Sequence, residues 1–134
     1  MADTTHIVKS FEQELKRLQS MMSEMGGMVE SQVANACLAV LSQDADAASR
    51  AMEADPRVDA AEHEVEQFVI RLLALRQPMA QDLRFIVAAL KMTGDIERIG
   101  DYAANVAKRS IVLGQFAMAY SLSGLAHMAA MVQD

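Results

Sequence analysis

The sequence has 134 residues, a formal net charge of −6 at pH 7, and 52% hydrophobic but only 4% aromatic residues. A chain of this length supports one domain around a single core. The acidic balance argues against a nucleic-acid partner, because phosphate backbones attract basic surfaces. Only two prolines and six glycines interrupt a sequence rich in alanine, leucine, methionine and glutamate, so the composition favours an all-α protein.

The first expected helix runs from about residue 5 to residue 41. Gly26-Gly27 interrupts its middle, which allows either a bend or a close approach by a neighbour. No apolar segment flanked by basic residues opens the chain, so we expect no signal peptide, and the single Cys37 suits a reducing, cytoplasmic location. The helix is predicted from apolar residues that recur at intervals of three and four: Ile7, Phe11, Leu15, Leu18, Met22, Met25, Val29, Val33, Ala36 and Val40.

A loop with one short helical turn is expected over residues 42–55, which are small and polar. Asp55-Pro56 is typical of a helix start, with aspartate as the N-cap and proline at the first helical position. The second helix would then extend to Gln77, where Pro78 disfavours helical geometry in the preceding residue. Its apolar seam is Val58, Ala61, Val65, Phe68, Leu72 and Leu75.

The third helix is predicted from about Pro78 to Leu113, and it carries two seams. The first is wholly apolar: Phe85, Ala89, Met92, Ile96, Ile99, Ala103 and Val106. The second begins apolar and becomes polar on the same face of the helix: Leu83, Ile86, Leu90, Gly94, Glu97, Asp101 and Asn105.

A fourth helix is expected after Gly114, with Leu122, Leu125, Ala129 and Val132 as its seam. No charged residue occurs between Ser110 and Gln133, a stretch long enough to span a bilayer, but its polar and small residues favour a bundle helix over a membrane span. Short connections imply antiparallel neighbours. We therefore expect an all-α fold: an antiparallel three-helix bundle over residues 1–113, plus part of a fourth helix over residues 114–134.

Two carboxylates of the third helix, Glu97 and Asp101, lie four residues apart, where like charges on a helix surface repel. Four acidic residues of the second helix either lie about as far from the turn at 77–78 as Glu97 and Asp101 do, or lie on the same flank of that helix's apolar seam: Asp55, Asp59, Glu62 and Glu66. Up to six carboxylates would then converge on one groove. Such a group is costly unless a cation joins it, and carboxylate oxygens suit Mg²⁺, Mn²⁺, Ca²⁺ or iron.

A competing interpretation is a hydrated acidic face, in which Arg98 pairs with Asp101 and Lys91 with Asp95. Asp55 has its own alternative role as a helix cap. The sequence contains no Glu-x-x-His, which disfavours a ferritin-like di-iron site, and no nucleophile has a base at usable spacing, so we expect no enzyme activity.

The stretch "LRQPMAQDLRFIVAALKMTGDIERIGDYAANVAKR" (75–109) closely resembles the signature helix of the PhoU family of phosphate-transport accessory regulators. Further similarity lies in "SFEQELKRL" (10–18), "MGGMVESQVANA" (25–36) and "DPRVDAAEHEVE" (55–66). The resemblance implies two tandem three-helix repeats, and this sequence ends about one helix into the second, so the second metal motif is missing.

The same resemblance implies a function. Family members are regulators that link the ATPase subunit of a phosphate ABC transporter to a membrane sensor histidine kinase, and they hold phosphate-starvation genes off when phosphate is plentiful. Their Glu/Asp-x-x-x-Asp motifs bind metal ions. Here the motif is Glu97-x-x-x-Asp101, with Asp59 and Glu62 as partners, for iron, manganese, magnesium or zinc. A homodimer is expected as well. The alternative is a structural helical module that binds a basic protein partner without metal.

Overall fold

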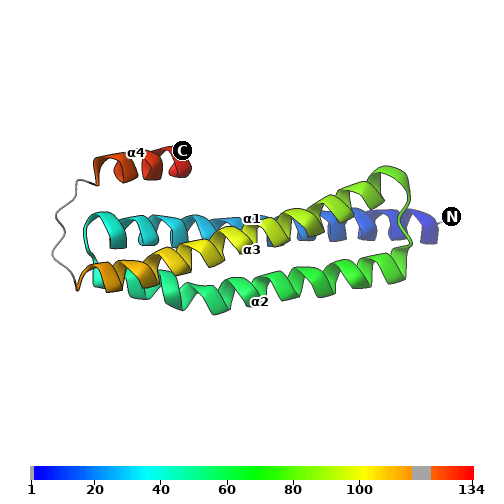
Figure 1. Ribbon diagram of the computed structural model, residues 1–134. Coiled ribbons are helices and arrows are strands. Elements are labelled where there is room, and N and C mark those ends of the chain that lie inside the picture. Colours follow the sequence, from blue (N-terminus) through cyan, green and yellow to red (C-terminus); the bar gives the residue numbers. More distant parts are fainter. Residues whose placement is uncertain (1, 116–121) are drawn as a thin grey trace.

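The protein is a long bundle of three helices with a fourth, shorter helix against its side (Figure 1). The computed structural model describes residues 2–115 and 122–134. Within them, helix α1 spans Ala2–Leu41, α2 spans Ala45–Arg76, α3 spans Ala80–Leu113 and α4 spans Ser123–Gln133. Helices α1, α2 and α3 all pack on one another, whereas α4 packs on α1. The expected all-α class and three-helix bundle are confirmed.

The core changes character along the bundle. At the end near the α2–α3 turn it is built from large side chains, among them Leu18, Val69 and Ile86. At the opposite end it consists of alanines: Ala36, Ala39, Ala47, Ala48, Ala51, Ala103 and Ala107. Between the two lie Met25, Val29 and Val58. The middle section carries the candidate site on its outer side.

Helix α2 begins eleven residues earlier than expected, and the loop assigned to residues 42–55 is wrong. Its N-cap is Asp44, whose Oδ1 accepts a hydrogen bond from the Ala47 backbone N at 3.0 Å. Pro56 lies inside the helix, so Asp55 is no cap. The error has a physical cause: alanine is both the best helix former and, here, the core residue of this end, although a search for large apolar residues passes over it.

The turn between α2 and α3 is slightly longer than expected, because α3 starts at Ala80 and Pro78 stays outside it. Gln77 closes α2 with a left-handed φ of 44°, and Ala80 has a φ of 54°. Gly26-Gly27, where a bend or a close neighbour was expected, produces no break in α1, and a Cβ on either residue would meet nothing within 4 Å.

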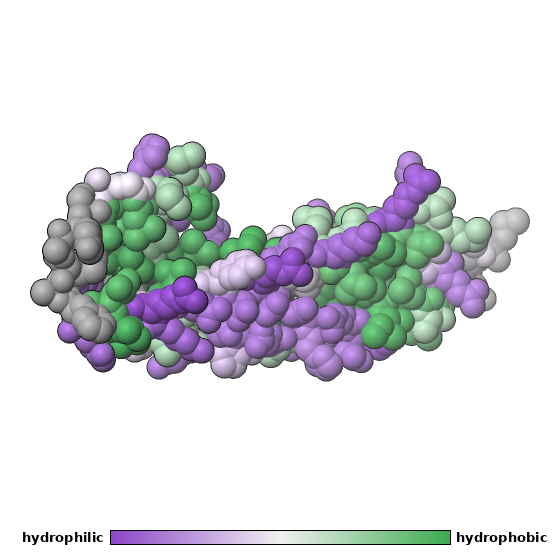
Figure 2. Space-filling model, viewed as in Figure 1, coloured by the Kyte–Doolittle hydropathy of each residue, from purple (hydrophilic) through white to green (hydrophobic). Residues whose placement is uncertain are grey.

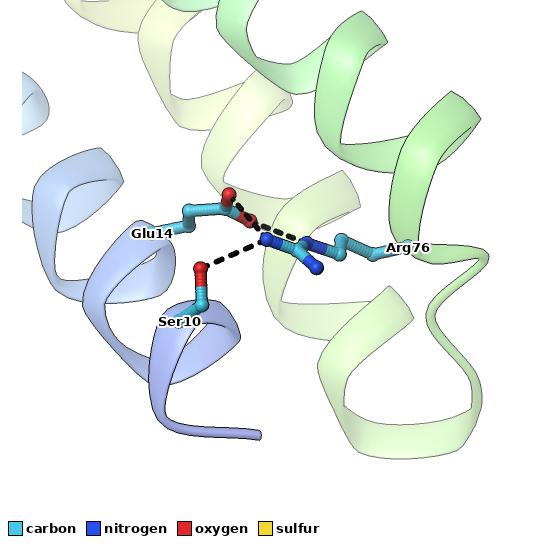
Figure 3. Close-up of polar contacts among 3 residues, drawn as sticks. All are labelled: Ser10, Glu14 and Arg76. Carbon is cyan, nitrogen blue, oxygen red and sulfur yellow. Dashed lines mark hydrogen bonds and ion pairs between the residues drawn. The ribbon is translucent and has the colours of Figure 1, made fainter. Parts of the chain in front are cut away.

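An ion pair fastens α1 to the end of α2 (Figure 3). Arg76 Nε donates to Glu14 Oε2 at 3.0 Å, while Arg76 Nη2 donates to Glu14 Oε1 and to Ser10 Oγ, each at 2.9 Å. The hydrogen bonds from Arg76 lower the pKa of Glu14. This paired contact aligns the two helices at the end where the turn leads into α3.

The expectation of a helix starting directly after Gly114 falls partly on residues 116–121, outside the described part of the chain. The described helix α4 starts at Ser123. Of its expected seam only Ala129 is buried, while Leu125 and Val132 are 39% and 69% exposed. Within the described residues, no helix combines the length and the hydropathy that crossing a membrane requires.

Candidate metal centre

Three of the four predicted ligands come together on the groove between α2 and α3. Asp59, Glu62 and Glu97 can each offer one carboxylate oxygen such that all three oxygens lie within 4.8 Å of one another. Asp59 and Glu62 are three residues apart on α2 and therefore share a side of that helix. Glu97 reaches them from α3, at the level that counting from the turn predicts. Figure 2 shows the hydrophilic surface that covers the middle of these two helices.

Clustering changes the acidity of these groups. Burial, a hydrogen bond with Asp59 and the charges of Glu62, Asp59 and Asp101 together raise the pKa of Glu97 to about 7. Burial, followed by the neighbouring Glu66 and Asp59, also raises the pKa of Glu62. Near neutral pH Glu97 is therefore only partly ionised, because burial and the neighbouring carboxylates both disfavour its charged form.

The other acidic residues of the predicted groove take different positions. Asp101 is exposed one turn beyond Glu97 and is not one of the three clustered groups, although its charge contributes to the raised pKa of Glu97. Asp55 is turned toward the bundle interior, where its Oδ1 accepts a hydrogen bond of 3.4 Å from Gln32 Nε2. Glu66 borders the cluster and raises the pKa of Glu62.

No basic side chain neutralises the cluster among the described residues. The only ion pair in that part of the chain is Glu14–Arg76, so the contacts of Arg98 with Asp101 and of Lys91 with Asp95, which a hydrated acidic face would use, are not formed. Opposite oxygen ligands lie about 4.0–4.2 Å apart around Mg²⁺ and about 4.6–5.2 Å apart around Ca²⁺. The carboxylate spacing therefore suits a hard cation.

Two residues behind the cluster escaped the sequence interpretation. Gln32, only 1% exposed, donates from Nε2 to the Ala51 backbone oxygen at 3.0 Å, while its Oε1 finds no hydrogen-bond partner within the described residues. Gly100 lies against this amide: a Cβ there would sit 2.7 Å from Gln32 Oε1 and 3.2 Å from Val29 Cγ2. The sequence did contain a sign of each: Gln32 is a polar residue beside the apolar seam of α1, and Gly100 is a glycine between Glu97 and Asp101.

Comparison with known proteins shows which family has this sequence and fold. Residues 22–110 match the family described as "PhoU domain". The chain belongs to the PhoU family. A "phosphate-specific transport system accessory protein PhoU homolog" of Caulobacter vibrioides is 46% identical over 110 residues, and one of Xylella fastidiosa is 51% identical over 108 residues. The PhoU resemblance seen in the sequence is thereby confirmed.

The solved structure of PhoU from Pseudomonas aeruginosa superposes with a TM-score of 0.88 at 36% identity, covering 92% of this chain and 59% of that one. The aligned regions cover 82% and 81% of this chain, but only 48% and 45% of the Caulobacter and Xylella proteins. The chain thus spans about half the length of its PhoU relatives. Their names place them in a phosphate transport system as accessory proteins.

Proposed function

We propose that this chain is a regulatory accessory protein of phosphate uptake, not an enzyme, and that it binds a cation at Asp59, Glu62 and Glu97. Asp101, one turn beyond Glu97 on α3, is included as a fourth ligand because its charge acts on Glu97, although it lies outside the three clustered groups. The observation that carries the cation site is the cluster itself: three carboxylates within 4.8 Å, one with its pKa raised to about 7, and no basic side chain paired with them in the described part of the chain. The PhoU homologues supply the link to phosphate transport.

Binding would join α2 to α3, because the three carboxylates come from both helices. The cation would replace the proton on Glu97 and fix the spacing of the two helices. Iron, manganese, magnesium and zinc are the candidates, and oxygen-only ligands favour the harder ions among them. The partners of a cation-loaded chain would be the ATPase subunit of a phosphate ABC transporter and a membrane sensor kinase, both met in the cytoplasm, with the chain present as a homodimer.

Calorimetric titration tests the site. Metal-free protein is titrated with Mn²⁺ and with iron, alongside the double variant Asp59→Ala/Glu97→Ala, which removes a ligand from each helix. Asp95→Asn, an exposed carboxylate on α3 outside the cluster, is the matched control. We expect binding by wild type and control, and none by the double variant. Equal binding by all three proteins would exclude this site.

The regulatory role has a separate test in cells that lack their own PhoU protein. Expression of the chain should restore repression of a phosphate-starvation promoter at high phosphate, and the double variant should not.

An open acidic groove also leaves room for a basic partner in place of a metal. Chelation with EDTA discriminates the two, since only a protein stabilised by bound metal loses melting temperature when the metal is removed.

A further inference from the structure

Three polar side chains are buried in the described part of the chain, and Gln32 is the one whose hydrogen bonds reach another helix. The other two, Thr93 and Ser110, each donate to a carbonyl oxygen of α3, the helix to which they belong. Gln32 on α1 instead donates to Ala51 and Asp55, both on α2. A polar side chain that is only 1% exposed is costly unless hydrogen bonds compensate for its lost water, so Gln32 is placed to join helices.

The orientation of the Gln32 amide is determined by its surroundings. The two α2 groups that it meets, the Ala51 carbonyl oxygen at 3.0 Å and the ionised Asp55 carboxylate at 3.4 Å, can only accept hydrogen bonds. Turning the amide over would place its oxygen against these two acceptors. Nε2 therefore faces α2, and Oε1 faces α3 with no hydrogen-bond partner among the described residues.

Gly100 is the residue of α3 that Oε1 faces. A Cβ at this position would lie 2.7 Å from Gln32 Oε1, 3.2 Å from Val29 Cγ2 of α1 and 3.5 Å from Val58 Cγ1 of α2. Glycine thus lets α3 approach both other helices at one point. Because protein interiors are close-packed, the amide that stands between α2 and α3 at this point limits how near the two helices can come.

The contacts of Gln32 lie within one turn of the acidic cluster on each helix. Asp55 precedes Asp59 by four residues on α2, and Gly100 follows Glu97 by three residues on α3. Residues three or four apart are neighbours on one side of a helix, about 5–6 Å from each other. The amide of Gln32 thus lies behind one clustered carboxylate of each helix, although it is not part of the cluster.

We propose that Gln32 is a positioning residue for the cation site: its amide, held between Asp55 of α2 and Gly100 of α3, sets the separation of the two helices at the level of the acidic cluster. Gln32 would contact no cation itself. The inference rests on the proposed function, because it gives α1 a part in a site whose three clustered carboxylates all come from α2 and α3. Replacing residues that hold metal ligands from behind commonly costs roughly 10–100-fold in metal affinity.

Calorimetric titration of the metal-free full chain with Mn²⁺ and with iron tests the positioning. Gln32→Met keeps an unbranched side chain of similar length without its hydrogen bonds, and we expect its dissociation constant to rise about tenfold or more over wild type. Val69→Ala is the matched control. Val69 is also 1% exposed, but it belongs to the core section near the α2–α3 turn, so the variant should lose stability and keep the wild-type affinity.

Asp55 gives a second test at a residue that is only half-buried. Asp55→Asn and Asp55→Ala remove the same charge, but only asparagine keeps a side-chain oxygen that can accept a hydrogen bond from Gln32 Nε2. We expect the alanine variant to bind the metal about threefold more weakly than the asparagine variant, or weaker still. Equal affinities of the two variants would show that this hydrogen bond has no part in the site, and would overturn the inference.

A double-mutant cycle in urea, with EDTA present, measures the contact with α3 in the absence of metal. Gly100→Ala should lower the urea midpoint of the wild-type chain, and at least half of that shift should disappear in a Gln32→Ala background, where the new methyl no longer meets the amide. An equal shift in both backgrounds contradicts the inference, because Gln32 would then not determine how closely α3 packs.

The titrations separate this inference from the proposed function. If wild type binds the metal and Gln32→Met binds it as tightly, or if Val69→Ala weakens binding as far as Gln32→Met does, the inference is wrong and the cation site stands. If wild type binds neither Mn²⁺ nor iron, the cation site itself is wrong, and the role of Gln32 in it is overturned as well.

Discussion

The raised pKa of Glu97 predicts a steep pH dependence of cation affinity. A cation binds the ionised carboxylate, so affinity is proportional to the ionised fraction below the pKa. With a pKa of about 7, Glu97 is about 1% ionised at pH 5 and about 90% ionised at pH 8, which gives a rise of roughly 90-fold in affinity. With its ordinary value of 4.5, the same carboxylate would give a rise of less than twofold over that range.

Mn²⁺ calorimetry between pH 5 and pH 8 measures this slope, and repeating it in buffers of different ionisation enthalpy counts the protons released. About one proton should leave per ion bound at pH 6 and almost none at pH 8. Glu97→Gln should bind more weakly, with a much flatter profile. Asp95→Asn should keep the wild-type slope. A wild-type profile that changes less than twofold, or a Glu97→Gln profile as steep as that of wild type, would refute the reasoning.

Three further outcomes follow from contacts described above. Gly100→Ala should lower the free energy of unfolding by about 1–3 kcal/mol in urea titration, because its methyl would sit 2.7 Å from a buried amide oxygen. Gly94→Ala, with open space around it, should raise the free energy of unfolding by up to about 1 kcal/mol. Arg76→Lys should lose most of the coupling with Glu14 that a double-mutant cycle measures, since lysine cannot form two parallel bonds to one carboxylate. Without metal, the raised pKa stabilises the fold only while Glu97 is protonated, so the melting temperature should fall between pH 4.5 and pH 7, and less so in Glu97→Gln.

The sequence was most informative where side chains repeat with the period of a helix. Large apolar residues at intervals of three and four placed α1 and α3 to within a few residues, and counting from the 77–78 turn brought Glu97 to the level of Asp59 and Glu62. Both inferences depend on helical rise and periodicity alone, which are properties of a single helix or hairpin.

What the sequence left out depends on contacts between distant residues. Gln32 becomes interpretable only when Ala51 and Asp55, 19 and 23 residues away, are seen to accept its amide hydrogens. The start of α2 was missed because its stabilising contacts are alanine against alanine. Asp101 shares a side of α3 with Glu97 but lies one turn further along the helix, and it stays exposed outside the three clustered carboxylates.

The placement of the cluster on two helices has a topological consequence. Glu62 and Glu97 are 35 positions apart in the chain, so a cation between them would close a loop that contains the whole α2–α3 turn. A rigid cross-link around a loop of this length removes entropy from the unfolded chain worth at most about 3–4 kcal/mol. None of the three clustered carboxylates belongs to α1. Metal-bound protein would therefore unfold first by detaching α1 from the closed α2–α3 hairpin. After removal of the metal, α2 and α3 could also separate from each other.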